Sequence, residues 1–112
     1  MTGLAKKGWD LVVDQSALSA AAKFATRKGA YAKIGRVADK SVRVEATPDG
    51  ICLNSSNYGA DVPGIGVWQS PIVVDGPMLA ALSPKLSGPT VRMQFRDGAL
   101  FLNTTRIGAT RG

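Results

Sequence analysis

An internal duplication is the feature that most constrains the fold of this chain. The sequence LVVD at residues 11–14 and the sequence IVVD at residues 72–75 are each followed, after three further residues, by a leucine. In both places the apolar run predicts a strand, and the aspartate that ends it can cap a following helix. A recurring pattern of this kind indicates a repeated structural unit. We therefore predict two pseudo-repeats, at about residues 9–62 and 68–112.

The later part of each copy also repeats, as a hairpin. In the first copy the alternating residues 41–47 reach the turn Asp49-Gly50, and in the second copy residues 91–95 reach Asp97-Gly98. Aspartate followed by glycine between two such runs is a strong hairpin signal. Asp14 and Asp75 lie 61 positions apart, whereas Asp49 and Asp97 lie 48 apart. The first copy therefore carries 13 extra residues between its helix and its hairpin.

The predicted fold class is α+β. We expect helices at 15–28 and 76–83 and a loop at 63–66. The predicted strands are 9–13, 41–47, 51–54, 55–62, 72–74, 91–95, 100–104 and 107–110. Tight turns join most of them, so we expect one antiparallel sheet with both helices packed on one side. At 112 residues the chain is long enough for one domain, 1–112, with a single core.

Catalytic chemistry has little support in the composition. The chain has no histidine, which excludes a Ser-His or Cys-His nucleophile and ordinary histidine-containing metal sites. The one cysteine, Cys52, falls in a predicted strand and is interpreted as a small core residue. Four of the eight carboxylates are assigned to helix caps or turns. We predict that the protein is not an enzyme and uses no cofactor or metal.

The positive charge of the chain is uneven. The formal net charge is +6, and residues 1–43 account for all of it, because residues 44–112 hold equal numbers of acidic and basic side chains. This asymmetry indicates a polyanionic partner. The candidate contacts with DNA phosphates cluster near the end of the first predicted helix and in the insert after it: Lys23, Arg27, Lys28, Lys33 and Arg36.

Two alternative roles for these cations stay open. Lysine and arginine near a helix C-terminus also complement the helix dipole, and a basic surface can serve solubility alone. The few aromatic residues fall mainly on apolar sides of the predicted elements, with Phe24 at the edge of the apolar stripe of its helix. A base-stacking platform is therefore not expected.

The duplicated unit resembles one domain of the bacterial type of DNA polymerase sliding clamp. The stretch that is most similar runs from 54 to 102 and includes YGADVP at 58–63, PIVVD at 71–75 and KLSG at 85–88. The resemblance implies a DNA-clamp-like fold, in which Lys23 and Arg27 would face DNA. The second predicted helix departs from this pattern, because 76–82 holds no basic residue.

The resemblance also implies self-assembly, since a clamp ring contains six such domains and this chain has one. The leading hypothesis is a non-catalytic protein that associates through its sheet edges and contacts the DNA backbone without sequence specificity. The alternative is a protein-protein interaction module, monomer or dimer, that does not bind DNA. No apolar run is long enough for a signal peptide or a membrane span, so we expect a cytoplasmic protein, nucleoid-associated if it binds DNA.

Overall fold

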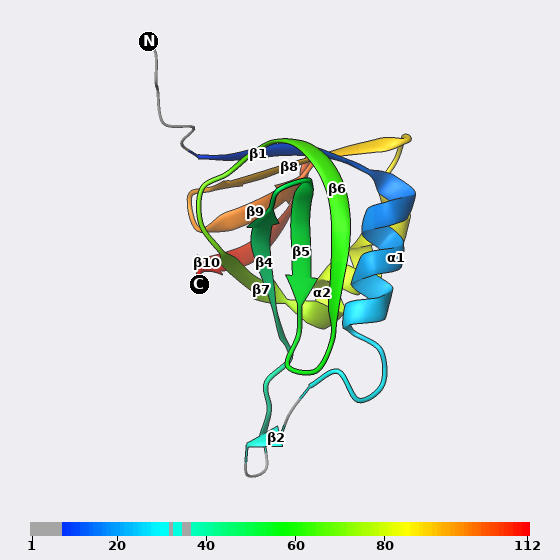
Figure 1. Cartoon of the computed structure of the whole chain (residues 1–112), viewed down its shortest axis with the longest axis vertical. Helices are drawn as coiled ribbons and strands as arrows, with labels where there is room; N and C mark the ends of the chain where they lie inside the picture. The colour runs from blue at the N-terminus through cyan, green and yellow to red at the C-terminus, as the bar shows by residue number, and fades with distance from the viewer. Residues whose placement is uncertain (1–7, 32, 35–36) are drawn as a thin grey trace.

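Eight antiparallel strands close into a barrel in the computed structural model, which describes residues 8–31, 33–34 and 37–112. Around the barrel the strands follow the order β1-β6-β5-β4-β7-β10-β9-β8. Their bounds are β1 Trp9–Asp14, β4 Ser41–Thr47, β5 Gly50–Asn54, β6 Gly59–Trp68, β7 Ile72–Asp75, β8 Thr90–Arg96, β9 Ala99–Leu102 and β10 Thr105–Arg111. A separate two-stranded sheet, β2 (Lys33–Ile34) with β3 (Val37–Ala38), lies away from the barrel (Figure 1).

Two short helices accompany the barrel, α1 (Gln15–Ala25) and α2 (Gly76–Leu82), and the 3₁₀ turn η1 (Ser83–Lys85) continues α2. The predicted aspartate caps are confirmed, because Asp14 Oδ2 accepts from Ala17 N and Asp75 Oδ2 accepts from Met78 N, each at 2.9 Å. The order of elements in the first half of the chain, strand, helix and three barrel strands, recurs in the second half.

The core lies between the barrel strands and the helices. Along most of the strands buried positions alternate with less buried ones, as in β1, where Leu11 and Val13 are buried and Val12 is not. Leu18 of α1 and Leu79 of α2 are fully buried in the same cluster. Figure 1 shows α1 along one side of the barrel, where it packs against β6 and contacts α2.

The predicted fold class was wrong in the arrangement of the strands. The sequence predicts an antiparallel sheet with two helices packed on one side, of the DNA-clamp kind, whereas the strands form a closed barrel. The cause is β1, which pairs with β6 along one edge and with β8 along the other. Those two pairings join strands that are far apart in the chain, and they bring the sheet back onto itself.

The predicted loop at 63–66 was also wrong, because these residues continue β6. The strand pairs with β5 over residues 59–63 and with β1 over residues 64–68. Gly64 and Gly66 make this possible, since glycine lets two backbones approach closely. A Cβ on Gly66 would collide with Asp10 O of β1, and its φ is +146°.

Closure of the barrel removes the free sheet edges through which self-association is predicted. Each of the eight strands has a neighbour on both sides, and barrels remove free edges in this way. Among the described barrel strands, association by strand pairing therefore has no continuous edge to use. Self-association stays a prediction, and it needs another surface.

An ion pair lies across the β1–β8 seam of the barrel. Arg92 donates from Nε and Nη2 to the two carboxylate oxygens of Asp10, at 2.9 and 2.7 Å. These hydrogen bonds hold the pKa of the Asp10 carboxyl below its ordinary value of 3.8. Because both side chains are largely exposed, solvent screens the pair, and we expect it to contribute little to stability.

The lowered Asp10 pKa fixes the sign of a pH effect. The stabilisation is fully present above the unfolded-state pKa and is lost as pH falls through the folded-state pKa. Arg92→Gln should lower the melting temperature by a few degrees at most at about pH 7, and by progressively less as acid protonates the Asp10 carboxyl. Thermal unfolding followed by circular dichroism checks this, and a difference that grows in acid would contradict it.

Candidate nucleic-acid interface

The exposed surface of α1 carries cations and an aromatic ring. Helical spacing divides the helix into a buried face, which includes Ala21, Ala22 and Ala25, and an outward face with Ala20, Lys23 and Phe24. The predicted helix 15–28 is too long, because α1 ends at Ala25. At the C-cap, the Thr26 hydroxyl donates to Ala22 O at 2.8 Å.

Arg27 and Lys28 therefore lie in the turn that follows α1, and both are exposed, as is Lys23. We call these three residues the basic end of α1. The sequence from 15 to 38 contains no acidic residue, so no carboxylate within that stretch offsets their charge. Exposed cations at this density favour a phosphate-bearing partner.

An aromatic pair, Phe24 and Tyr58, lies beside the basic end. The two ring centroids are 5.4 Å apart and the rings are inclined at 71°, the edge-to-face geometry that aromatic rings favour. The guanidinium carbon of Arg27 lies 5.4 Å from each ring centroid. A cation at this distance is attracted by the ring faces. The two rings therefore hold the Arg27 guanidinium in position.

Tyr58 comes from the connection between β5 and β6, and hydrogen bonds attach that connection to the turn after α1. Asn57 donates from Nδ2 to Gly29 O at 2.8 Å and from its backbone N to Ala30 O at 3.0 Å. Ser55 N donates to Tyr58 O at 2.8 Å. Because these bonds join two segments distant in sequence, Tyr58 is held in place beside Phe24.

A shallow groove of about 410 Å³ runs along the same surface. Its lining is Ala20, Lys23, Phe24 and Arg27, and we call it the α1 groove. Phe24 is 41% exposed, although a phenylalanine is usually buried. The α1 groove therefore combines an accessible ring with two cations, and the small side chain of Ala20 leaves room beside that ring.

The predicted phosphate contacts divide into three groups. Lys23, Arg27 and Lys28 come together at the basic end of α1. Lys33 is in β2, in the separate two-stranded sheet, so it does not belong to α1. Arg36 lies outside the described residues.

The aromatic pair was not predicted from the sequence. Phe24 falls at the edge of the apolar stripe of its helix, and that borderline position was the available signal for an exposed ring. Tyr58 gave no signal, because its contact with α1 depends on a connection 34 residues further along the chain.

The other helical segments add little charge to this surface. α2 carries no basic residue, as predicted, and Met78 is its exposed apolar side chain. Lys85 is exposed on η1. Gln15 Nε2 donates to Ser83 O at 2.7 Å, which places η1 beside the first residue of α1, at the opposite end of the helix from Arg27 and Lys28.

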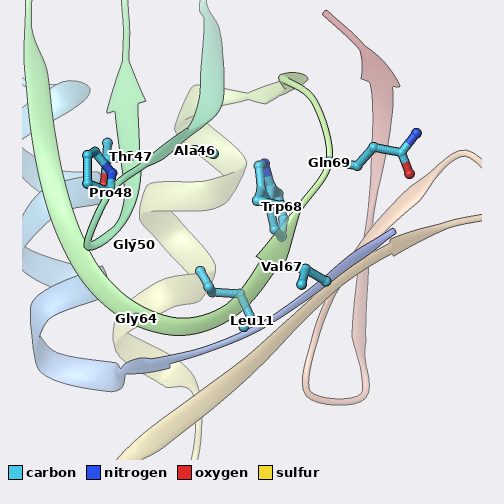
Figure 2. Close-up of a pocket in the computed structure, with 10 residues that line it drawn as sticks. Leu11, Ala46, Thr47, Pro48, Gly50, Gly64, Val67, Trp68 and Gln69 are labelled. Carbon is cyan, nitrogen blue, oxygen red and sulfur yellow. The ribbon is translucent and has the colours of Figure 1, made fainter. Parts of the chain in front are cut away.

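A second cavity, of about 260 Å³, opens in the barrel wall (Figure 2). It lies between the β4–β5 turn and the second half of β6, and its lining includes Leu11, Thr47 and Trp68. The Trp68 indole donates from Nε1 to Val44 O at 3.1 Å, and Gln69 Oε1 accepts from Gly8 N at 2.7 Å. Because its lining holds no charged side chain, we assign this cavity no chemistry.

Cys52 is not a core residue, contrary to the sequence interpretation. It is half-buried on β5, and Sγ donates to Asn54 Oδ1 at 3.4 Å. Burial, together with the nearby Asp61 carboxylate, raises the pKa of the Cys52 thiol. A raised pKa lowers the thiolate fraction, so the thiol is a poor nucleophile.

Among residues 8–31, 33–34 and 37–112, no group of three or more histidine, cysteine, aspartate or glutamate side chains is placed to hold a metal ion. In the part of the chain that the structure describes, neither helix has the length and apolar character needed to cross a membrane.

Comparison of the chain with models of protein families gives no match, and comparison with curated proteins gives none either. The resemblance to a sliding-clamp domain gains no support from these comparisons.

Proposed function

We propose that the protein binds DNA through the phosphate backbone, without sequence preference, at the basic end of α1. The observation that carries the proposal is the exposure of Lys23, Arg27 and Lys28 together, in a stretch of sequence free of acidic residues. Exposed lysine and arginine contact phosphates without reading base edges. A protein with this activity would associate with the nucleoid.

Charge complementarity explains the surface better than helix stabilisation alone. The helix dipole favours cations near the last turn of α1, and Lys23 satisfies that preference. Arg27 and Lys28 come after the helix has ended, and Arg27 is held by the aromatic pair rather than by the helix carbonyls. These two cations are therefore available to a ligand.

A salt titration tests the proposal. A labelled duplex of about 20 base pairs is titrated with the protein, and binding is followed by fluorescence anisotropy at several salt concentrations. Three phosphate contacts predict a slope of about −2.7 for the logarithm of the association constant against the logarithm of salt concentration. Absence of binding even at low salt would overturn the proposal.

A second candidate function, a protein interaction module, is favoured by a different surface. Ile65 of β6 is 86% exposed, and its cross-strand partner Val12 of β1 is 41% exposed. Adjacent exposed apolar side chains on a barrel wall are typical of a protein contact. Light scattering over a range of concentrations, with Ile65→Ser beside the unmodified chain, tests whether this surface joins two copies. A monomer at every concentration would exclude self-association there.

A further inference from the structure

We propose that the α1 groove takes an unstacked base of a single-stranded nucleic acid, with the base against Phe24 and the adjoining phosphates at Lys23 and Arg27. This inference rests on the proposed function and narrows it, because it makes a single strand the preferred ligand over a duplex. The aromatic ring is the feature that backbone binding leaves unexplained.

Phe24 presents an exposed ring that duplex phosphates do not contact. A duplex keeps its bases stacked inside, so a protein that contacts only duplex phosphates has no use for an exposed ring. A single strand offers base faces, and proteins that bind single strands place aromatic side chains within a positively charged groove. Phe24 lines the α1 groove together with Lys23 and Arg27 and is 41% exposed.

Its neighbours hold the Phe24 ring in a fixed position. Phe24 packs edge to face against Tyr58, and the hydrogen bonds of Asn57 to Gly29 and Ala30 hold the connection that carries Tyr58. A ring that is already ordered loses little conformational entropy when a ligand binds. The aromatic pair is therefore prepared for stacking before a ligand arrives.

Space and charge around the ring complete the site. In a helix, side chains lean toward the N-terminus, so Phe24 extends toward the turn that carries Ala20. Ala20 is too small to cover the ring, and the α1 groove opens there. The Arg27 guanidinium carbon lies 5.4 Å from the Phe24 centroid, so the backbone phosphate of a nucleotide whose base stacks on the ring would be within reach of a cation.

Paired oligonucleotides test the inference. Binding of labelled oligo-dT and of a duplex of equal length is measured by anisotropy for the unmodified chain and for Phe24→Leu, which keeps an apolar side chain but removes the ring. We expect the unmodified chain to prefer the single strand. We expect Phe24→Leu to weaken single-strand binding roughly five- to hundredfold and to weaken duplex binding much less, because the Tyr58 ring still holds Arg27. Oligo-U in place of oligo-dT distinguishes RNA from DNA as the source of the strand.

A matched control is available on the barrel wall, where the Arg96 guanidinium carbon lies 4.0 Å from the Phe101 centroid. Phe101→Leu removes an equivalent ring under an arginine, and it should leave single-strand binding unchanged. Circular dichroism confirms that both variants fold.

Failure of the inference is distinguishable from failure of the proposed function. The inference is overturned, while the proposed function stands, if duplex binds as tightly as single strand or if Phe24→Leu weakens both alike. It is also overturned if an acidic peptide, and not oligo-dT, depends on Phe24 for binding. If neither nucleic acid binds at low salt, both proposals fall.

Discussion

Gly66→Ala should lower the free energy of unfolding by about 4 kcal/mol, as the sum of backbone strain and overpacking. The φ of Gly66 is +146°, a conformation that residues with a side chain rarely adopt. An added Cβ would also meet Asp10 O and would lie 2.8 Å from Leu11 Cα, and both of these are backbone atoms of β1 that cannot rotate away. Urea unfolding followed by tryptophan fluorescence measures the loss.

Gly108→Ala is the matched control, because Gly108 is a glycine of barrel strand β10 with no atom within 4 Å of an added Cβ. It should change stability by no more than about 0.5 kcal/mol. If the two variants are equally stable, β1 and β6 do not approach as closely as described, and closure of the barrel would be in error.

The double variant Lys23→Glu with Arg27→Glu should weaken duplex DNA binding by at least about tenfold at low salt and should reduce the salt slope by about 2. Both effects follow from the loss of two phosphate contacts and the appearance of two repelling carboxylates. Fluorescence anisotropy against salt concentration provides both numbers, and circular dichroism shows whether the exposed substitutions leave the fold intact.

The double variant Arg96→Glu with Arg106→Glu distinguishes the effect of the proposed site from the effect of the net charge of the protein. It makes the same change in net charge, at exposed positions on β8 and β10. It should leave the salt slope nearly unchanged. Equal losses in the two double variants would show that binding follows net charge and that the basic end of α1 has no special role.

The local elements of this fold could be predicted because their signals are local. Asp14 and Asp75 mark the starts of the two helices, and Asp97-Gly98 sits in a tight hairpin with positive φ at both residues. Alternation in 41–47 matches the buried Val42 and Val44 of β4. Each of these features depends on residues within a few positions of one another.

Closure of the barrel could not be predicted in the same way. It depends on β1 pairing with β6 and β8, whose partners lie more than 50 residues away. The glycines at 64 and 66 suggested a loop, since glycine is common in both loops and closely approaching strands. The pairing of residues 64–68 with β1 is what distinguishes a strand from a loop here.

The candidate site likewise combines residues that local sequence indicates with a residue whose place depends on a distant contact. Lys23, Arg27 and Lys28 could be predicted as candidates from the charge asymmetry and from their place near the end of the first predicted helix. Tyr58 could not, because its place against Phe24 depends on the hydrogen bonds of Asn57 to the turn after α1. The position of Phe24 at the edge of the apolar stripe is the sequence signal for its exposed ring, and it gives no indication of the contact with Tyr58.

The most direct test of the central claim, that α1 carries the nucleic-acid surface, is a titration of the ¹⁵N-labelled protein with oligonucleotide, followed by amide chemical shifts. The predicted result is that shifts concentrate in residues 20–28 and around Tyr58, while the barrel wall near Ile65 and Arg106 stays unchanged. Shifts centred on the barrel wall, or none on α1 at saturating oligonucleotide, would contradict the assignment.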